Sequence, residues 1–262
     1  MGWDARSAQG WGKLAEGAKA IVNLAGASLK GEGFLPSRWT AKRNRVIRES
    51  RVNAGAAVVE AVRAAKRKPE VVVQASAVGY YGARDAVRLD ENAQPGDDFP
   101  AQVCVEWEQS SQAVEALDVR RCVVRTGLPL TKAGGAFPLL QLPFVLYSGN
   151  WFGDGQQFFS WIHYVDEIRA LRFLIDTPKT SGAYNLTAPD PVSNREFARS
   201  LGNVMRRPVW MPAPGFVMKL ALGEVSTVVL DGQRAEPVAL LKAGFRFKYP
   251  KLDEALRAIV NE

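Results

Sequence analysis

The sequence predicts an α/β protein built on a Rossmann-like parallel sheet. Three short segments, near 20–26, 71–75 and 121–125, are apolar runs of the kind found in strands buried on both faces. A long stretch of helical periodicity, 40–68, separates the first two, which is the pattern of a β-α-β crossover. We expect this sheet to be followed by a small, mainly helical C-terminal lobe.

The second strand carries polar side chains just beyond its carboxyl end. After Val71–Ala75 come Ser76, Tyr80 and Tyr81, within the run SAVGYYG. Ligands of open parallel sheets bind at the carboxyl ends of the strands. We therefore predict a ligand site at this end of the sheet.

The other elements follow in order up to about residue 188. Apolar residues from Ile47 to Ala65 recur at helical spacing, and Pro69 ends that helix. The polar stretch 84–100 predicts a loop over the strand ends. Further along we expect a helix over 106–117, a strand over 121–125, a helix over 166–175 and a strand over 183–187.

We divide the chain into residues 1–188, a nucleotide-binding domain, and residues 189–262, a helical domain. Aromatic residues crowd 127–165, which suits either a lobe that closes over a small-molecule substrate or an ordinary aromatic core. Ser193 and Glu196 form a capping box that starts the helical part. There we expect a stiff connector over 208–214, helices near 215–222, 234–243 and 251–260, and a helix-ending Gly244.

Composition excludes several classes of function. Cys104 and Cys122 form no C-x-x-C pair, which fits a reducing compartment. No signal peptide and no apolar run of about 18–20 residues is present, so we expect a cytoplasmic protein without a membrane partner. His163 is the only histidine, so sites with several histidine ligands are excluded, and we predict no metal site. We expect His163 to cap the helix near Asp166, the alternative being a base oriented by that carboxylate.

The net charge of +7 is concentrated in one segment. Between Arg38 and Lys68, ten basic residues accompany two acidic ones. A basic helix can bind nucleic-acid phosphates. Because no aromatic platform interleaves these charges, we expect a solvated helix face and no nucleic-acid partner. An arginine of this helix, Arg51, is a candidate for the 2′-phosphate of NADP.

Five short motifs occur in a recognisable order. They are Asn23–Gly26 (NLAG), Ser76–Gly82 (SAVGYYG), Arg125–Gly127 (RTG), Trp161–Asp166 (WIHYVD) and Tyr184–Pro189 (YNLTAP). Together they resemble the extended short-chain dehydrogenase/reductases, and most of all the atypical branch called epimerase family proteins. Some members carry a cell-division label, and they end in a domain of unknown function. That ending is similar to Gly223-Glu224, Gly232–Arg234, Pro237 and Ala243–Phe247 here, so the resemblance covers essentially the whole chain.

The resemblance implies an NAD(P)-dependent oxidoreductase or a nucleoside-sugar-epimerase-like protein that uses NADP or else NAD. It implies Ser76 as the catalytic serine and Asp4 as an acidic residue near the adenine. The remaining implied cofactor contacts are Asn23, Leu24, Ala25 and Gly26 beside the nicotinamide ribose, and Arg125 and Gly127 beside the nicotinamide.

The chain departs from that family near its start. Gly10–Ala15 matches G-x-G-x-x-A, but no strand precedes it, so we expect a surface turn and a short helix there. The family's first strand and its glycine-rich loop, which binds pyrophosphate, would then be missing, and cofactor binding would be weakened or absent. That strand is central in the doubly wound order. We therefore expect an exposed sheet edge, so that the chain is either poorly soluble or pairs this edge with a second copy.

The family's catalytic tyrosine and lysine, spaced Y-x-x-x-K, are also replaced. No tyrosine has a lysine four residues later, and Pro100 and Cys104 align with the pair. Tyr80 or Tyr81 could take over general acid–base work. Otherwise one of them packs under the loop and the other is partly exposed.

With Ser76, these two tyrosines are the candidate catalytic residues. Cys104 is expected to be a buried small residue. The alternative function is a non-catalytic nucleotide-sensing or interaction scaffold associated with cell division.

Overall fold

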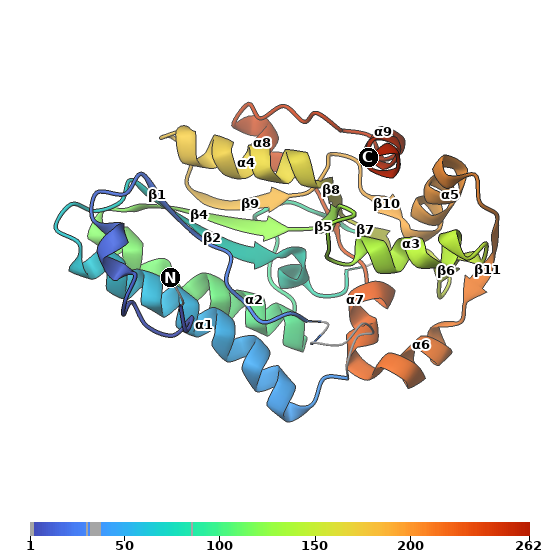
Figure 1. The fold of residues 1–262 in the computed structure, drawn as a ribbon, viewed down its shortest axis with the longest axis horizontal. Helices are drawn as coiled ribbons and strands as arrows, with labels where there is room; N and C mark the ends of the chain where they lie inside the picture. Colours follow the sequence, from blue (N-terminus) through green and yellow to red (C-terminus); the bar gives the residue numbers. More distant parts are fainter. Residues whose placement is uncertain (1–2, 30, 32–37, 85) are drawn as a thin grey trace.

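The computed structural model describes residues 3–29, 31, 38–84 and 86–262 (Figure 1). Its centre is a four-stranded sheet in the order β1-β2-β4-β9, with every neighbouring pair parallel. The strands are β1 (Ala20–Asn23), β2 (Val71–Ala77), β4 (Arg120–Thr126) and β9 (Gly182–Leu186). The predicted α/β fold with a Rossmann-like parallel sheet is therefore confirmed.

Helices cover both faces of this sheet (Figure 1). The helices α1 (Ala41–Ala64) and α2 (Phe99–Ser110) lie on one face, and α4 (Tyr164–Asp176) and α8 (Val238–Lys242) lie on the other. Side chains of β2 alternate accordingly: Val72 packs with the α1 side, whereas Val71 and Val73 pack with the α4 side. All three valines are fully buried, which explains why the strand is continuously apolar.

The sequence explains where the helix α1 begins and how closely it packs against α2. Thr40 caps it, because the Thr40 hydroxyl accepts a hydrogen bond from the Arg43 amide. Gly55 lets α1 approach α2 closely, since a Cβ atom at this position would lie 1.8 Å from Ser110 Oγ. The strand β2 starts soon after Pro69. One close helix pair therefore supports the first half of the sheet.

A second lobe contains short strand pairs and helices, and most of them pack around one shared core. Phe137, Trp161, Leu201 and Leu256 are among its buried members, so segments before and after residue 188 pack together. The pairs around this core are β5 (Leu128–Leu130) with β8 (Trp161–His163), β6 (Gly149–Phe152) with β11 (Val209–Ala213), and β7 (Phe158–Phe159) with β10 (Val192–Ser193). A further pair, β3 (Arg88–Leu89) with β12 (Arg234–Ala235), packs against Tyr81 in a separate cluster. The helices are α3 (Phe137–Val145), α5 (Asn194–Met205), α6 (Gly215–Leu222), α7 (Thr227–Leu230) and α9 (Leu252–Asn261).

Several local predictions hold. Ser193 and Glu196 form the capping box at the start of α5. Gly244 ends α8 with a φ of +91°, which favours glycine. His163 caps α4 by accepting a hydrogen bond from the Val165 amide at 3.1 Å. A 3-10 helix, Gly12–Ala15, occupies the region of the isolated glycine motif, as expected.

Three local predictions are wrong. The expected helix 106–117 begins earlier, at Phe99, because Asp98 caps it, and it continues as a 3-10 helix over Gln112–Leu117. The expected connector 208–214 contains the strand β11, which pairs in parallel with β6. The expected helix 234–243 is a strand, β12, followed by the shorter α8.

Among the described residues, no helix is long and apolar enough to cross a lipid bilayer.

Candidate functional site

A cavity of about 260 Å³ lies at the carboxyl end of the sheet. The last residues of β2 and β4 and the two residues after each, Ala77–Gly79 and Thr126–Leu128, form one side of it. The first turns of α2 and the side chain of Arg51 form another side, and residues from 158–160 and 227–233 contribute from the second lobe. The predicted end of the sheet thus carries the cavity.

Gly127 is required by a close approach of two backbone segments at this cavity. A Cβ atom on Gly127 would lie 2.0 Å from the carbonyl oxygen of Ser160. The Ser160 hydroxyl in turn donates to the Gln233 carbonyl at 2.6 Å and accepts from the Ala235 amide at 2.8 Å. The C-terminal segment is therefore tied to the strand ends through buried hydrogen bonds.

Pro100 and Cys104 both line the cavity, at the positions that align with the family's Tyr/Lys pair. Cys104 is buried, as predicted, and burial raises the pKa of its thiol to about 12. The thiol is therefore neutral at physiological pH and is not a ready nucleophile. Neither side chain can supply the acid–base function of a tyrosine and lysine.

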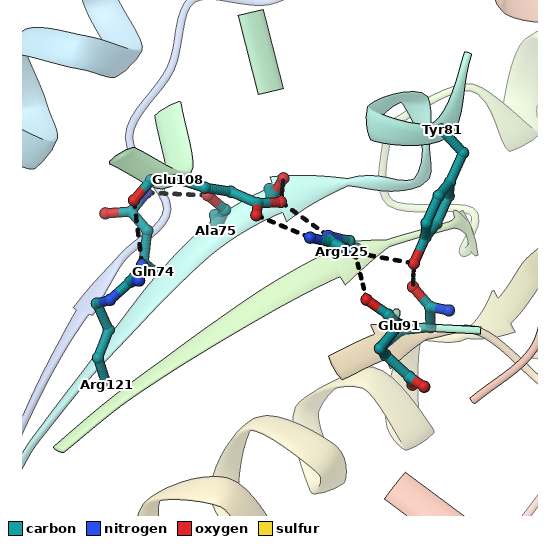
Figure 2. A network of polar contacts seen from close by, with 9 residues as sticks. Gln74, Ala75, Tyr81, Glu91, Glu108, Arg121 and Arg125 are labelled. Atoms are coloured by element: carbon teal, nitrogen blue, oxygen red, sulfur yellow. Dashed lines mark hydrogen bonds and ion pairs between the residues drawn. The ribbon is translucent and has the colours of Figure 1, made fainter. Parts of the chain in front are cut away.

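A polar network lies behind the cavity and centres on Arg125 (Figure 2). Its guanidinium binds both carboxylate oxygens of Glu108, at 2.8 and 2.9 Å. Ser76 Oγ donates to the same carboxylate at 2.7 Å. Two-pronged arginine–carboxylate pairs of this kind fix geometry strongly. The network therefore locks α2 to the ends of β2 and β4.

The two tyrosines contact the other side of Arg125. Tyr81 is fully buried; its hydroxyl donates to Asn185 Oδ1 at 2.7 Å and accepts from Arg125 Nη1 at 3.1 Å. Burial raises the pKa of Tyr81 to about 12. The half-buried Tyr80 has its ring against the guanidinium, whose Cζ lies 3.5 Å from the ring centroid. Each tyrosine thus has a packing role, and the catalytic roles of Ser76, Tyr80 and Tyr81 stay predictions.

Glu108 and Glu91, whose backbone carbonyl accepts from Arg125, are members of this network that sequence reasoning missed. Glu108 follows Pro100 and Cys104 at successive spacings of four residues, so the three side chains share one face of α2. This spacing of four residues is the sequence signal that could have identified Glu108. The cationic partner of the half-buried Glu108, Arg125, lies on a separate element and is not indicated by this spacing.

The end of β1 carries Asn23, and the segment after it brings Gly26 to the neighbourhood of Arg51. Asn23 is buried, and its side-chain amide donates to Gln74 Oε1 at 3.0 Å. Leu24 is 60% exposed and Ala25 is half-buried. A Cβ atom on Gly26 would lie 3.1 Å from Arg51 Cζ, so the guanidinium packs against the glycine backbone.

Arg51 is held by neutral groups. Its Nη1 donates to the Ala27 and Ile47 carbonyls at 3.1 and 3.0 Å, and its guanidinium stacks on Trp107 at 4.9 Å. Burial lowers the pKa of Arg51 below its usual value. These partners orient the cation, and among the described residues no carboxylate pairs with Arg51 as Glu108 does with Arg125.

The predicted adenine contact, Asp4, is exposed and bonds locally. Its Oδ1 accepts from the amides of Arg6 and Ser7 at 2.9 and 3.2 Å. The adjacent Trp3 lines a second hollow, of about 420 Å³, which also reaches Asn23 and Leu24 beside β1. Asp4 is therefore near the outer side of the sheet, and its ligand role stays a prediction.

Comparisons with known proteins agree with this geometry. A family model described as a domain of unknown function, DUF1731, matches residues 213–259. The Arabidopsis thaliana chloroplastic homologue of epimerase family protein SDR39U1 is 39% identical over 253 residues, which covers 96% of this chain and 71% of that protein.

Two solved structures are similar over nearly the whole chain. The human epimerase family protein SDR39U1, crystallised with NADPH, aligns with a TM-score of 0.87 and 29% identity, covering 94% of this chain and 82% of that one. A nucleoside-diphosphate sugar epimerase from Corynebacterium glutamicum aligns with a TM-score of 0.77 and 30% identity, covering 99% of this chain and 49% of that one. On the fold, the motifs and these relatives, the chain belongs to the epimerase family proteins.

Proposed function

We propose that this protein binds NADP(H) at the carboxyl end of its sheet and acts as an oxidoreductase or epimerase-like enzyme. The observation that carries the proposal is that three features line one cavity. They are the end of β2, Gly127 with its close backbone approach to Ser160, and the cationic side chain of Arg51. The human relative that was crystallised with NADPH supports it.

In this proposal the residues Asn23–Gly26 line the ribose, where small side chains allow the backbone to approach a cofactor. Arg51 contacts a phosphate, because a guanidinium that no carboxylate of the described residues pairs with favours an anion. Gly127 admits the nicotinamide, which supplies hydride chemistry when the cofactor is bound. Arg125 positions the loop beneath it, and Asp4 keeps its expected place near the adenine.

The proton-transfer residues of the proposal are Ser76, Tyr80 and Tyr81. Ser76 and Tyr81 already donate their hydroxyl protons to Glu108 and Asn185. Each would have to exchange that partner before it could serve a substrate. Tyr80 is the more accessible of the two tyrosines. We therefore place Tyr80 first among the candidates for acid–base work.

A second function is favoured by a specific observation at the cavity. Pro100 and Cys104 line it where an ionisable pair would stand. A protein that kept the nucleotide site and lost this pair would sense nucleotides or hold partners without catalysis. Turnover, rather than binding, distinguishes the two functions.

Thermal unfolding with NADPH, and with NADH for comparison, tests the binding. A ligand at about 100 times its Kd stabilises a protein by about 2.7 kcal/mol, which raises Tm visibly. We expect a larger shift with NADPH, and we expect Arg51→Gln to reduce that shift. Arg45→Gln, an exposed change on the same helix, should not. The absence of a shift with both cofactors would refute the proposal.

We also propose that two copies pair through β1. Among the described residues this strand pairs only with β2, so its other side offers unpaired N–H and C=O groups. Val22 and Leu24 are 40% and 60% exposed there, and the nearby Leu14 is 69% exposed. A two-fold arrangement would bring the same apolar edge of each copy together.

A further inference from the structure

The cavity at the carboxyl end of the sheet is lined mainly by hydrocarbon. Aromatic and aliphatic side chains from both lobes face it, and they include Trp39, Phe99, Val103, Leu128, Phe158 and Phe159. Some aromatic residues of the segment 127–165, such as Phe137 and Trp161, are instead fully buried in the core. That segment therefore contributes both to a core and to the cavity.

Most polar side chains around the cavity already have partners within the protein. The indole N–H of Trp107 has none among the described residues, and the Arg51 guanidinium is assigned above to a cofactor phosphate. Asp98 Oδ1 accepts from the Ala101 amide at 2.8 Å, and Gln233 Nε2 donates to the Gly82 carbonyl at 3.1 Å. The Ser160 hydroxyl both donates and accepts, and the Cys104 thiol is a weak donor. A ligand rich in hydroxyl groups would lose its bonds to water here and find few replacements.

The size of the cavity gives a second limit. A dry, apolar cavity of about 150 Å³ is large enough to hold benzene. In the proposed function, the nicotinamide at Gly127 and the phosphate at Arg51 take part of the present cavity, of about 260 Å³, so the remainder has room for one substituted ring. A sugar joined to a nucleoside diphosphate is both larger and far more polar.

We propose that this cavity takes a compact, apolar, ring-containing substrate rather than a sugar nucleotide. The inference rests on the proposed function, because it assigns the substrate side of the same site. Stacking on Phe158, Phe159 or Trp39 would orient the ring, as aromatic pairs do. Specificity would come from shape and exclusion of water.

Binding of two probes tests the inference: acetophenone as a small ring ketone, and UDP-glucose as a sugar nucleotide. Saturation-transfer NMR of the full chain, with and without NADP⁺, reports each probe. We expect binding of acetophenone and none of UDP-glucose at the same millimolar concentration. Binding of UDP-glucose, or absence of acetophenone binding under both conditions, overturns the inference.

Two variants locate the bound ring. Ala136 lines the cavity and is half-buried, so Ala136→Phe should fill the space and lower the acetophenone affinity at least several-fold. Ala133→Phe, an exposed change nearby, should leave the affinity unchanged. Equal affinity in Ala136→Phe and the unchanged protein places the ring elsewhere and also overturns the inference.

A smaller substitution, Gly79→Ala, keeps the test valid if Ala136→Phe fails to fold. A Cβ atom on Gly79 would lie 3.7 Å from Pro100 Cβ and 4.0 Å from Cys104 Sγ, which is ordinary contact, so Gly79→Ala should fold and weaken the ring ligand slightly. The NADPH thermal shift is read separately. If that shift is absent while acetophenone binds, the cofactor proposal fails and the cavity assignment remains. If the shift is present while UDP-glucose binds, only the substrate inference fails.

Discussion

The two edge strands of the sheet, β1 and β9, differ in whether other parts of the chain cover their outer side. The outer side of β9 is covered: its Asn185 amide donates to Glu91 Oε1 at 3.0 Å, and the Asn185 side chain donates to the Glu236 carbonyl at 2.9 Å. The helix α8 also packs against this strand. β1 instead has Val22 exposed, and Leu24 just after the strand is exposed too, both beside the hollow of about 420 Å³.

This difference separates an edge closed within the chain from one that remains available for pairing. Segments distant in sequence, 88–91 and 234–239, supply the partners of β9. Those partners are polar groups: the Glu91 carboxylate faces the Asn185 amide, and the Glu236 carbonyl faces the Asn185 side chain. Around β1 the neighbouring side chains are apolar, which favours association over solvation. The contrast between the two strands can be tested from either side.

The largest expected effect comes from breaking the covered edge. Asn185→Leu would leave the Tyr81 hydroxyl and the Glu236 carbonyl without their buried partner. Each such loss costs about 1–3 kcal/mol, so the free energy of unfolding should fall by about 3 kcal/mol or more. Urea denaturation measures the change. Asn203→Leu, an exposed change on α5, is the control, and equal midpoints for the two variants would contradict the role of Asn185.

A smaller effect is expected when a charge is placed on the open edge. Val22→Lys should reduce self-association, because lysine on an edge strand opposes pairing with another strand. Sedimentation velocity across a wide range of concentration measures it. Val87→Lys changes an exposed valine outside β1 and should leave association unaltered. A chain that stays monomeric at the highest concentration would refute pairing through β1.

The sequence predicts the sheet well because its signals are local. Val71–Val73, Thr40 and the Ser193 capping box each carry their structural meaning within a few residues. β11 was missed because Pro212 resembles a connector and its partner, β6, is distant in the chain. The start of α2 was missed because a capping aspartate, Asp98, lies in a run that looks like a loop.

The candidate site was predictable only in part, for a similar reason. The strand ends that line it, including Gly127, follow from the parallel topology. The roles of Glu108 and Ser160 depend on partners brought together from separate elements, such as Arg125 and Ala235. No local pattern marks those partners. The edge contrast is likewise a tertiary property, since β1 and β9 are both short apolar strands in sequence.

The smallest expected effect is a dependence of the covered edge on pH. Glu91 accepts from the amides of Asn185 and Ala239, and burial, which outweighs these bonds, raises the pKa of its carboxyl above the usual 4.5. The folded state therefore binds this proton more readily than the unfolded chain does. The stability that the proton contributes is present below pH 4.5 and is lost as pH rises through the raised pKa.

Glu91→Gln removes this titration while it keeps an oxygen that can accept one of the two amides. Urea unfolding from pH 4 to 7 should show the unchanged protein losing stability relative to Glu91→Gln as pH rises. Glu254→Gln, an exposed change on α9, controls for the loss of one surface charge. If the unchanged protein instead lost stability relative to Glu91→Gln as pH fell, the pKa of Glu91 would be lowered in the folded state. The hydrogen bonds from the two amides, rather than burial, would then control this carboxyl. In that case the contacts that cover β9 would be strongest when Glu91 is charged, and the covered edge would depend on charge-assisted hydrogen bonds from the two amides.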